Sequence, residues 1–293
     1  MLAGVAAGVF FAAGCGARKV IPVAPAPALE SASVRQLVGD FNRDADAITR
    51  MQLKLKLTAR AGSHKYTSVT AYLLTQKPSS IRMWGTFTLV GKIFDMASNG
   101  DSFELSIPTY NQFYTGLNNV IPAVTGHPLE TMRPQVILNA LLINPIAPGD
   151  HVALDPGSGP AEYELLVLRP GAGGVDRLVR RITFSRYDLL PHAQVLYDSD
   201  GVHATMATYS DFTLSDGIPV PQDINIERAV EGYALRLQIV KGGITLNQPF
   251  SGPDPFTLKP SAGATIRKLS AAAPGPGGGG DAADQAAPGR PSS

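Results

Sequence analysis

The feature that most constrains the fold is a series of short segments in which apolar and polar residues alternate. In the first segment, Leu53, Leu55 and Leu57 alternate with polar residues over 52–58. A period of two places the leucines on one face of a β-strand and the polar side chains on the other. The segment therefore predicts a strand in a sheet that has one face in water.

Turn residues separate the other strands that the pattern predicts. The triplet Asn99-Gly100-Asp101 is a strong hairpin signal because Asn and Gly tolerate positive φ, and Ser215-Asp216-Gly217 is another predicted turn. After the first strand, the predicted strands lie at 65–75, 80–89, 92–98, 102–107, 112–115, 162–168, 176–187, 192–198, 203–214, 220–228 and 234–239. Spacing of this kind, with about eleven strands, predicts one large, curled antiparallel sheet.

Two segments have the helical period instead. Over 30–50, apolar residues recur at steps of three and four, and Ser31 or Ser33 is in position to cap the helix. The second predicted helix covers 134–143, with Pro134 at a favourable first position. This second segment is apolar on all sides, which predicts that it is buried or covers a cavity.

The apolar faces of the strands supply the candidate binding residues. Alternation places one set on a common inner face: Leu53, Leu55, Leu57, Met83, Phe87, Phe103, Leu105, Leu235 and Leu237. Trp84 is expected to face the opposite way from Met83. These side chains either pack against the helices as a solid core or line a cavity, since two helices cannot fill so wide a curled sheet. A register shift of one residue would exchange the inner and outer faces.

The chain begins with an uncharged apolar run over 1–14 that ends in Ala13 and Gly14 and is followed by Cys15, the only cysteine. The run is shorter than the ~20 residues that cross a bilayer, but it suits the apolar region of a signal peptide. It resembles the lipobox of bacterial lipoproteins, which implies cleavage before Cys15 and acylation of its thiol. The alternatives are an ordinary cleaved signal and a buried N-terminal strand. One cysteine excludes a disulfide framework.

Composition divides the rest of the chain. Alternating prolines over 21–28 predict an extended spacer, and Ala, Pro and Gly dominate from residue 270 onward, with four glycines at 277–280. The predicted organisation is a signal peptide (1–14), a lipidated cysteine with a Pro-rich spacer (15–29), a folded domain (30–269) and a disordered tail (270–293).

Charge and motifs exclude several classes of function. The net charge is +1 with mixed signs along the chain, which argues against a nucleic-acid partner. The histidines lack the spacing of a metal motif, His192 and His203 are expected to be a surface pair, and no Gly-x-Ser-x-Gly pattern occurs. We therefore expect no enzyme activity, no metal and no cofactor. Arg82 and Lys92 either meet a lipid headgroup at the cavity rim or are solvated charges.

The order of these parts is similar to that of the LolA/LolB-like lipoprotein-carrier superfamily, over roughly 33–240. Two steps carry the resemblance: Lys77-Pro78 before Ile81-Arg82, and Asn99-Gly100-Asp101 before Phe103-Glu104-Leu105. The resemblance implies a mainly β (α+β) fold, an unclosed half-barrel with two or three helices as plug or lid. It also implies an apolar interior that holds the acyl chains of a lipoprotein.

Together with Cys15, the likeness points to the membrane-bound receptor branch of that superfamily, and Gly16 is compatible with outer-membrane delivery. That branch has a protruding apolar loop with an exposed leucine, and the segment 116–132 is either its equivalent or a covered connection. We therefore expect a bacterial outer-membrane lipoprotein on the periplasmic face, in lipid or lipoprotein transport, that binds acyl chains such as palmitate or another apolar ligand. The alternatives are a structural or assembly lipoprotein with an envelope protein partner and no ligand, and a tethered hydrolase.

Overall fold

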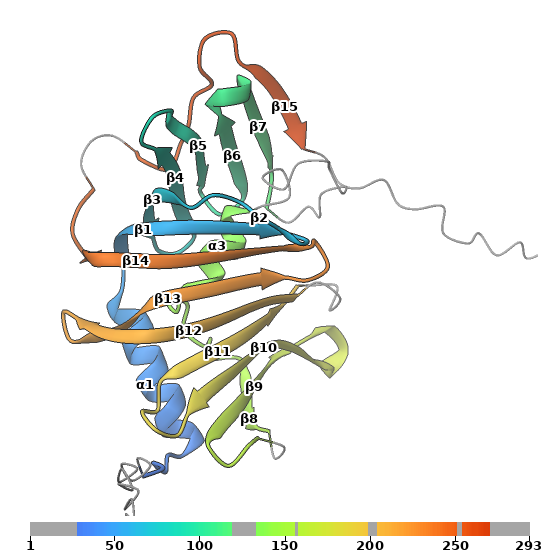
Figure 1. The fold of residues 1–293 in the computed structure, drawn as a ribbon. Helices are drawn as coiled ribbons and strands as arrows, with labels where there is room; N and C mark the ends of the chain where they lie inside the picture. Colours follow the sequence, from blue (N-terminus) through green and yellow to red (C-terminus); the bar gives the residue numbers. More distant parts are fainter. Residues whose placement is uncertain (1–27, 119–132, 156–157, 199–203, 251–253, 270–293) are drawn as a thin grey trace, which may run out of the picture.

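The computed structural model describes residues 28–118, 133–155, 158–198, 204–250 and 254–269 (Figure 1). The helices are α1 (Val34–Ala47) and α3 (Pro134–Ala140), with the short 3-10 turns η1 (Pro108–Tyr110) and η2 (Ala172–Gly174). The strands are β1 (Arg50–Ala61), β2 (His64–Lys65), β3 (Val69–Gln76), β4 (Ser80–Phe87), β5 (Gly91–Ser98), β6 (Ser102–Ile107), β7 (Gln112–Leu117), β8 (His151–Leu154), β9 (Glu162–Pro170), β10 (Asp176–Ser185), β11 (Pro191–Tyr197), β12 (Ala204–Ser215), β13 (Ile218–Arg228), β14 (Tyr233–Leu246) and β15 (Thr265–Leu269). The predicted signal peptide, Cys15, most of the spacer and the tail lie outside the described residues.

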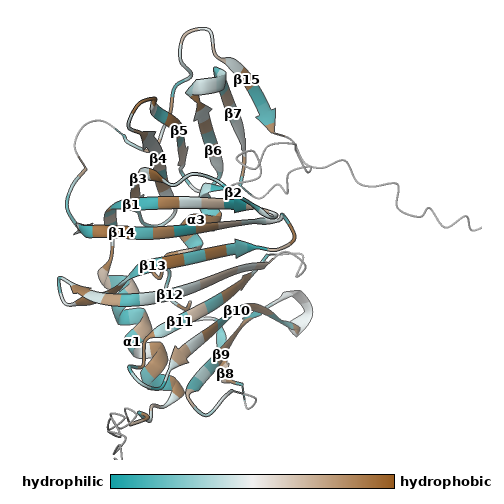
Figure 2. Cartoon of the chain, in the orientation of Figure 1, coloured by the Kyte–Doolittle hydropathy of each residue, from teal (hydrophilic) through white to brown (hydrophobic). Residues whose placement is uncertain are grey.

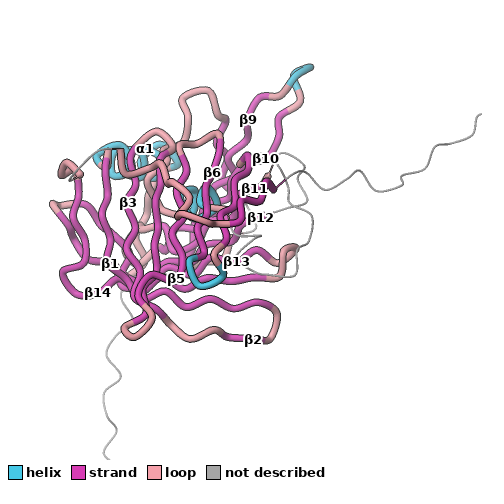
Figure 3. The backbone as a smooth tube through the Cα atoms, turned by 90° about the horizontal axis from the view of Figure 1, so that it is seen from above, coloured by secondary structure: helices cyan, strands magenta, loops and turns pink. Residues whose placement is uncertain are grey.

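All of these strands belong to one 15-stranded sheet. Its order is β15-β7-β6-β5-β4-β3-β1-β14-β13-β12-β11-β10-β9-β8, with β2 paired to β1. Neighbours are antiparallel except for β15, which runs parallel to β7. The two end strands do not pair with each other, so the sheet is an unclosed half-barrel whose strands curve around a shared interior (Figure 3). The predicted fold class is confirmed.

The strand prediction missed three strands and placed several ends early. They are β2, which has two exposed residues, and β8 and β15, which lie at the two edges of the sheet. These strands have few buried residues and therefore no clear alternation. The sequence 65–75 is divided between β2 and β3, and β14 continues well beyond the predicted end at 239. Figure 2 shows the alternation of polar and apolar residues on the long central strands, which is the signal that the prediction used.

Helix α3 lies inside the curl of the sheet. It contacts β4 and β5 on one arm and β11 and β12 on the other, and Ile137 is fully buried. The helix ends at Ala140, earlier than predicted, because Leu141 has an extended backbone with ψ 127°. Helix α1 is also shorter than predicted: Ser33 caps its start by accepting a hydrogen bond from the backbone N–H of Gln36. Within the described part of the chain, no helix is long and apolar enough to cross a membrane.

The central core lies between α3 and the inner face of the sheet. Leu55 is fully buried there among side chains from β1, β3, β4 and β14. Replacing Leu55 with Ala removes three buried carbons and leaves a cavity, so we expect Leu55→Ala to lower the free energy of unfolding by about 2–5 kcal/mol. Urea denaturation followed by circular dichroism measures the change.

The matched control is Leu214→Ala, because the Leu214 side chain is 75% exposed. A surface truncation of this kind is expected to change the free energy of unfolding by about 0.5 kcal/mol or less. Equal losses in the two variants would contradict the assignment of Leu55 to the core.

A candidate apolar cavity beneath helix α1

Helix α1 covers part of the sheet that α3 does not reach. Its apolar stripe of Leu37 and Phe41 packs on Ile182 and Phe184 of β10, and the rings of Phe41 and Phe184 meet edge to face at 6.2 Å. The helical period of the sequence produces this stripe, because residues three or four apart lie on one face. The helix therefore acts as one wall over the concave side of β9–β13.

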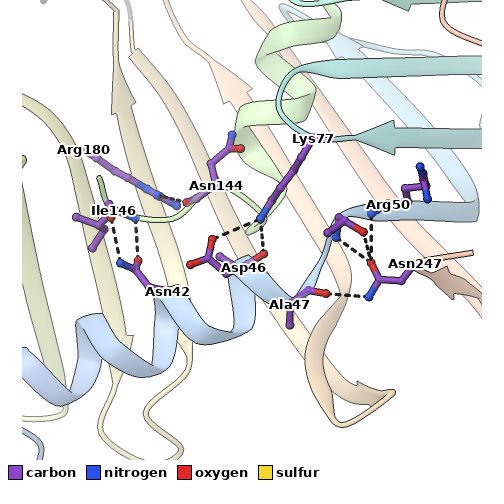
Figure 4. Close-up of polar contacts among 11 residues, drawn as sticks. Asn42, Asp46, Ala47, Arg50, Lys77, Asn144, Ile146, Arg180 and Asn247 are labelled. Carbon is purple, nitrogen blue, oxygen red and sulfur yellow. Dashed lines mark hydrogen bonds and ion pairs between the residues drawn. The ribbon is translucent and has the colours of Figure 1, made fainter. Parts of the chain in front are cut away.

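Polar contacts fix α1 along its length (Figure 4). In the middle, Asn42 Nδ2 donates to the Ile146 carbonyl at 3.0 Å, and the Ile146 N–H donates to Asn42 Oδ1 at 2.8 Å. At the C-terminal end, Lys77 Nζ donates to the Ala45 carbonyl and Asn247 Nδ2 donates to the Ala47 carbonyl. The last carbonyls of a helix lack partners within the helix, and Asn247 satisfies that of Ala47. Lys77 adds a second hydrogen bond to the Ala45 carbonyl, which also accepts from the Ile48 N–H.

The segment 141–146, which follows α3, is held to the sheet in the same way. Tyr209 Oη donates to the Ala140 carbonyl at 2.6 Å, and Arg180 Nη1 donates to the Asn144 carbonyl at 2.9 Å. Together with the Asn42 pair, these bonds hold the segment between α1 and the strands. We refer to residues 141–146 as the strap.

A cavity of about 440 Å³ lies between α1, the strap, strand β1 and strands β10–β14. Most of its wall is apolar, and the apolar lining residues are Phe41, Ile48, Met51, Leu53, Leu141, Leu142, Ile143, Phe184, Leu189, Leu190, Pro191, Phe212, Ile218, Pro219, Val220, Pro221, Ile224 and Ile239. An apolar wall of this size suits an apolar ligand.

Four charged side chains also line this cavity: Asp40, Arg43, Asp44 and Asp188. Arg43 forms ion pairs with Asp40 and Asp44, and its hydrogen bonds to Asp44 and Asp40 raise the pKa of the guanidinium. Asp188 contacts His192 Nε2 at 2.9 Å. The Arg43 side chain is 65% exposed and the Asp188 side chain 39% exposed, so this polar part of the lining is in contact with water.

The turn between β10 and β11 forms part of the wall and is fixed by its own hydrogen bonds. The Leu189 N–H donates to the Ser185 carbonyl at 2.9 Å, and the Leu190 N–H donates to Asp188 Oδ1 at 3.0 Å. Leu189 has a φ of +56°, a conformation that a leucine rarely adopts unless its surroundings impose it. This side of the cavity is therefore preformed.

The structure places the sequence-predicted site residues in three environments. Leu53 lies in the cavity wall. The central core contains Leu55, Leu57, Met83, Phe103, Leu105, Leu235 and Leu237. Phe87 is 39% exposed, which corrects its predicted inward position: β4 ends there, and an extra residue in β5, Ile93, interrupts the pairing between Gly85 and Thr86. Trp84 faces outward as predicted and stacks on Tyr72.

Other predicted features have local partners. Arg82 and Lys92 both bind Asp95, whose side chain is 6% exposed, so both cations are engaged in ion pairs. His192 contacts Asp188, while His203 and most of the segment 116–132 lie outside the described residues. In the described part of the chain, no group of three or more His, Cys, Asp or Glu is placed to hold a metal ion.

Sequence reasoning missed most of the cavity wall because much of it is not on regular strands. The strap and the 188–191 turn carry adjacent apolar residues without a period, and nothing in such runs indicates which element they will cover. Two features of the sequence do indicate part of the wall. One is the helical stripe that contains Phe41, and the other is the pair Pro219 and Pro221, which places apolar groups on β13.

The turn between β4 and β5 exposes a compact apolar group. Leu89 is 91% exposed, Val90 58% and Phe87 39%. Large side chains of this kind at one turn form a small apolar surface in contact with water.

No protein-family model and no curated protein matches the sequence. Solved structures similar to this chain include a LolA superfamily protein from Nitrosomonas europaea, with 16% identity, 75% of this chain and 97% of that chain covered, and a TM-score of 0.48. A proposed outer membrane lipoprotein-sorting protein domain from Vibrio parahaemolyticus has 7% identity, 75% and 93% coverage and a TM-score of 0.48. A DUF1329 family protein from Desulfovibrio piger has 10% identity, 75% and 96% coverage and a TM-score of 0.47.

The two hydrogen bonds between Asn42 and Ile146 are predicted to stabilise the strap, which forms part of the cavity wall. Asn42→Ala removes both hydrogen bonds and leaves the Ile146 amide without its acceptor, so we expect a loss of about 1–3 kcal/mol in the free energy of unfolding. Amide hydrogen exchange at Ile146 should become faster. The exposed Gln36→Ala on the same helix is the control, and equal exchange rates at Ile146 in the two variants would refute the role of Asn42.

Proposed function

We propose that this chain is a cell-envelope lipoprotein that holds an acyl chain of a lipid or lipoprotein in the cavity beneath α1. The observation that carries the proposal is the 440 Å³ space with a mainly apolar wall and charged groups in contact with water. Its volume lies in the range of ~300–1,000 Å³ that is typical of small-molecule sites. Hydrocarbon needs no polar partner, and this wall offers few.

The energetics favour a long hydrocarbon over a small polar molecule. Each methylene that leaves water for an apolar site contributes about 0.8 kcal/mol, so part of one acyl chain is enough for useful affinity. The hydrogen bonds of the strap and of the 188–191 turn keep this space preformed, which lowers the cost of ordering on binding. Binding of this kind requires no covalent chemistry, and we propose that the protein is not an enzyme.

The β4–β5 turn supports a membrane-facing role. A leucine that is 91% exposed at a turn tip is available for insertion into the apolar boundary of a bilayer. We assign this contact to Leu89, with Val90 beside it. The proposal also includes acylation of Cys15. The acyl chains anchor the protein to the periplasmic face of the outer membrane, where it acts in lipid or lipoprotein transport.

Filling the cavity tests the ligand site. Ile239 lies in the wall and is partly buried, so Ile239→Trp places a larger ring in the space that the ligand would occupy. We expect the dissociation constant for a fluorescent fatty acid to rise by roughly tenfold or more, equivalent to losing the burial of about two methylenes. Fluorescence titration measures it.

The control for this variant is Ile266→Trp, which adds the same ring at a residue that is 62% exposed on β15. That variant should bind the fatty acid as the unmodified chain does. Unchanged affinity in a folded Ile239→Trp protein would exclude the cavity as the binding site.

Charge at the turn tip tests the membrane contact. In a chain with Cys15→Ser, which has no acylation site, Leu89→Glu removes a large apolar group from the bilayer and should reduce vesicle partitioning roughly tenfold. Co-sedimentation with phosphatidylethanolamine–phosphatidylglycerol vesicles measures it. Leu214→Glu, at another exposed leucine, is the control, and the two variants behaving alike would count against a specific role for Leu89.

A further inference from the structure

A second cavity, of about 270 Å³, lies on the other side of the strap, between residues 136–150 and strands β9–β12. Its wall differs from that of the first cavity because polar and charged groups are prominent in it. Its charged residues are the cations Arg169, Arg177 and Arg180 and the carboxylates Asp150 and Asp198. Nothing in the proposed acyl-chain site uses this cavity.

Arg180 is a buried cation in this wall. The residue is only 6% exposed, and its guanidinium lies 4.8 Å from the centre of the Phe41 ring. Its Nε donates to Gln194 Oε1 at 2.7 Å and its Nη1 to the Asn144 carbonyl at 2.9 Å, while its Nη2 has no hydrogen-bond partner. All of its present partners are neutral.

The charge of Arg180 has no counter-ion within the described residues. Burial lowers the pKa of its guanidinium to about 10, so the group still carries its charge at neutral pH. A buried charge without an opposite charge is costly, and an anion that enters the cavity would relieve that cost.

Arg177 reaches the same cavity because β10 has an irregularity in its pairing with β9. The register shifts between Leu178 and Arg180, where Val179 is the extra residue. Such a bulge changes which side chains share a face, and Arg177, Val179 and Arg180 all line the cavity. Arg177 is exposed, and among the described residues it donates to the Asp198 backbone carbonyl, at 3.3 Å.

The other charges of the wall are in ion pairs. Arg169 Nε and Nη2 both donate to the Asp150 carboxylate at 2.9 Å, and Asp198 accepts from Arg228 at 2.9 Å. Arg228 is shared between Asp198 and Glu231. Within the described residues, Arg177 and Arg180 form no ion pair with a carboxylate.

We propose that this cavity is a binding site for an oxyanion, a phosphate or carboxylate group, which Arg177 and Arg180 hold together. Guanidinium groups match such anions because their N–H groups donate in a planar fork. Arg177 is accessible at the entrance, and Arg180 supplies fixed charge in the interior. The proposal does not depend on the acyl-chain site.

The test uses the full chain and inorganic phosphate as the probe. Thermal unfolding is followed by circular dichroism in increasing sodium phosphate at constant ionic strength, since an anion that binds the folded state raises the midpoint. The variants are Arg177→Gln and Arg180→Gln. The control is Arg267→Gln, an exposed arginine on β15 at the opposite edge of the sheet.

We expect phosphate to raise the midpoint of the unmodified chain and of Arg267→Gln equally. Arg177→Gln should need roughly tenfold more phosphate for the same rise, because one charged hydrogen-bond donor is lost. Arg180→Gln should abolish the response; if that variant fails to fold, Arg177→Gln alone decides. No response in the unmodified chain, or equal responses in Arg177→Gln and Arg267→Gln, would overturn the proposal.

Two further probes distinguish a lipid headgroup from a free anion. If dihexanoyl phosphatidic acid binds at least tenfold more tightly than phosphate and loses affinity in Arg177→Gln, the ligand is a lipid headgroup. If the two affinities are equal, the ligand is a small free anion. If dihexanoyl phosphatidylcholine binds as tightly as phosphatidic acid and its binding does not depend on Arg177, the oxyanion site is contradicted. Ile239→Trp should leave the phosphate response unchanged, which separates this site from the acyl-chain cavity.

Discussion

In the described part of the chain, the sheet is wider than the two helices that lie over it can cover, and this mismatch shapes the interior. Those helices have 14 and seven residues, and the curled sheet has 15 strands. Helix α1 has a narrow buried stripe of Leu37, Phe41 and Ala45. Hydrogen bonds from Asn42, Lys77 and Asn247 add to its apolar packing, and the apolar cavity lies beneath the helix.

The same mismatch divides the interior into two regions. Where α3 lies between the two arms of the sheet, side chains such as Leu55 and Ile137 are fully buried. Near α1, the strap and the 188–191 turn cover the sheet and leave the apolar cavity open. The two readings of the inner face, a solid core and a cavity, therefore both hold, each in its own region.

The sequence was sufficient for the fold because its signal is local. Leu53, Leu55 and Leu57 define a face by themselves, and Gly100 and Gly217 adopt the positive φ that the hairpin turns require. It was insufficient for the site because the cavity depends on which segments cover which strands. Leu189 reaches the cavity because its surroundings impose a positive φ, and Ile143 reaches it because helix α3 ends early. Neither feature produces a periodic pattern in the sequence. The burial of Arg180 was equally hidden, since a charged residue in a strand is normally read as exposed.

The strap connects the two proposed sites physically. Ile143 faces the apolar cavity, Asn144 the charged one, and Phe41 lines the first while contacting the guanidinium of Arg180 in the second. Displacing the strap would break the Arg180–Asn144 and Asn42–Ile146 hydrogen bonds together. The strap therefore ties the wall of the apolar cavity to the guanidinium of Arg180.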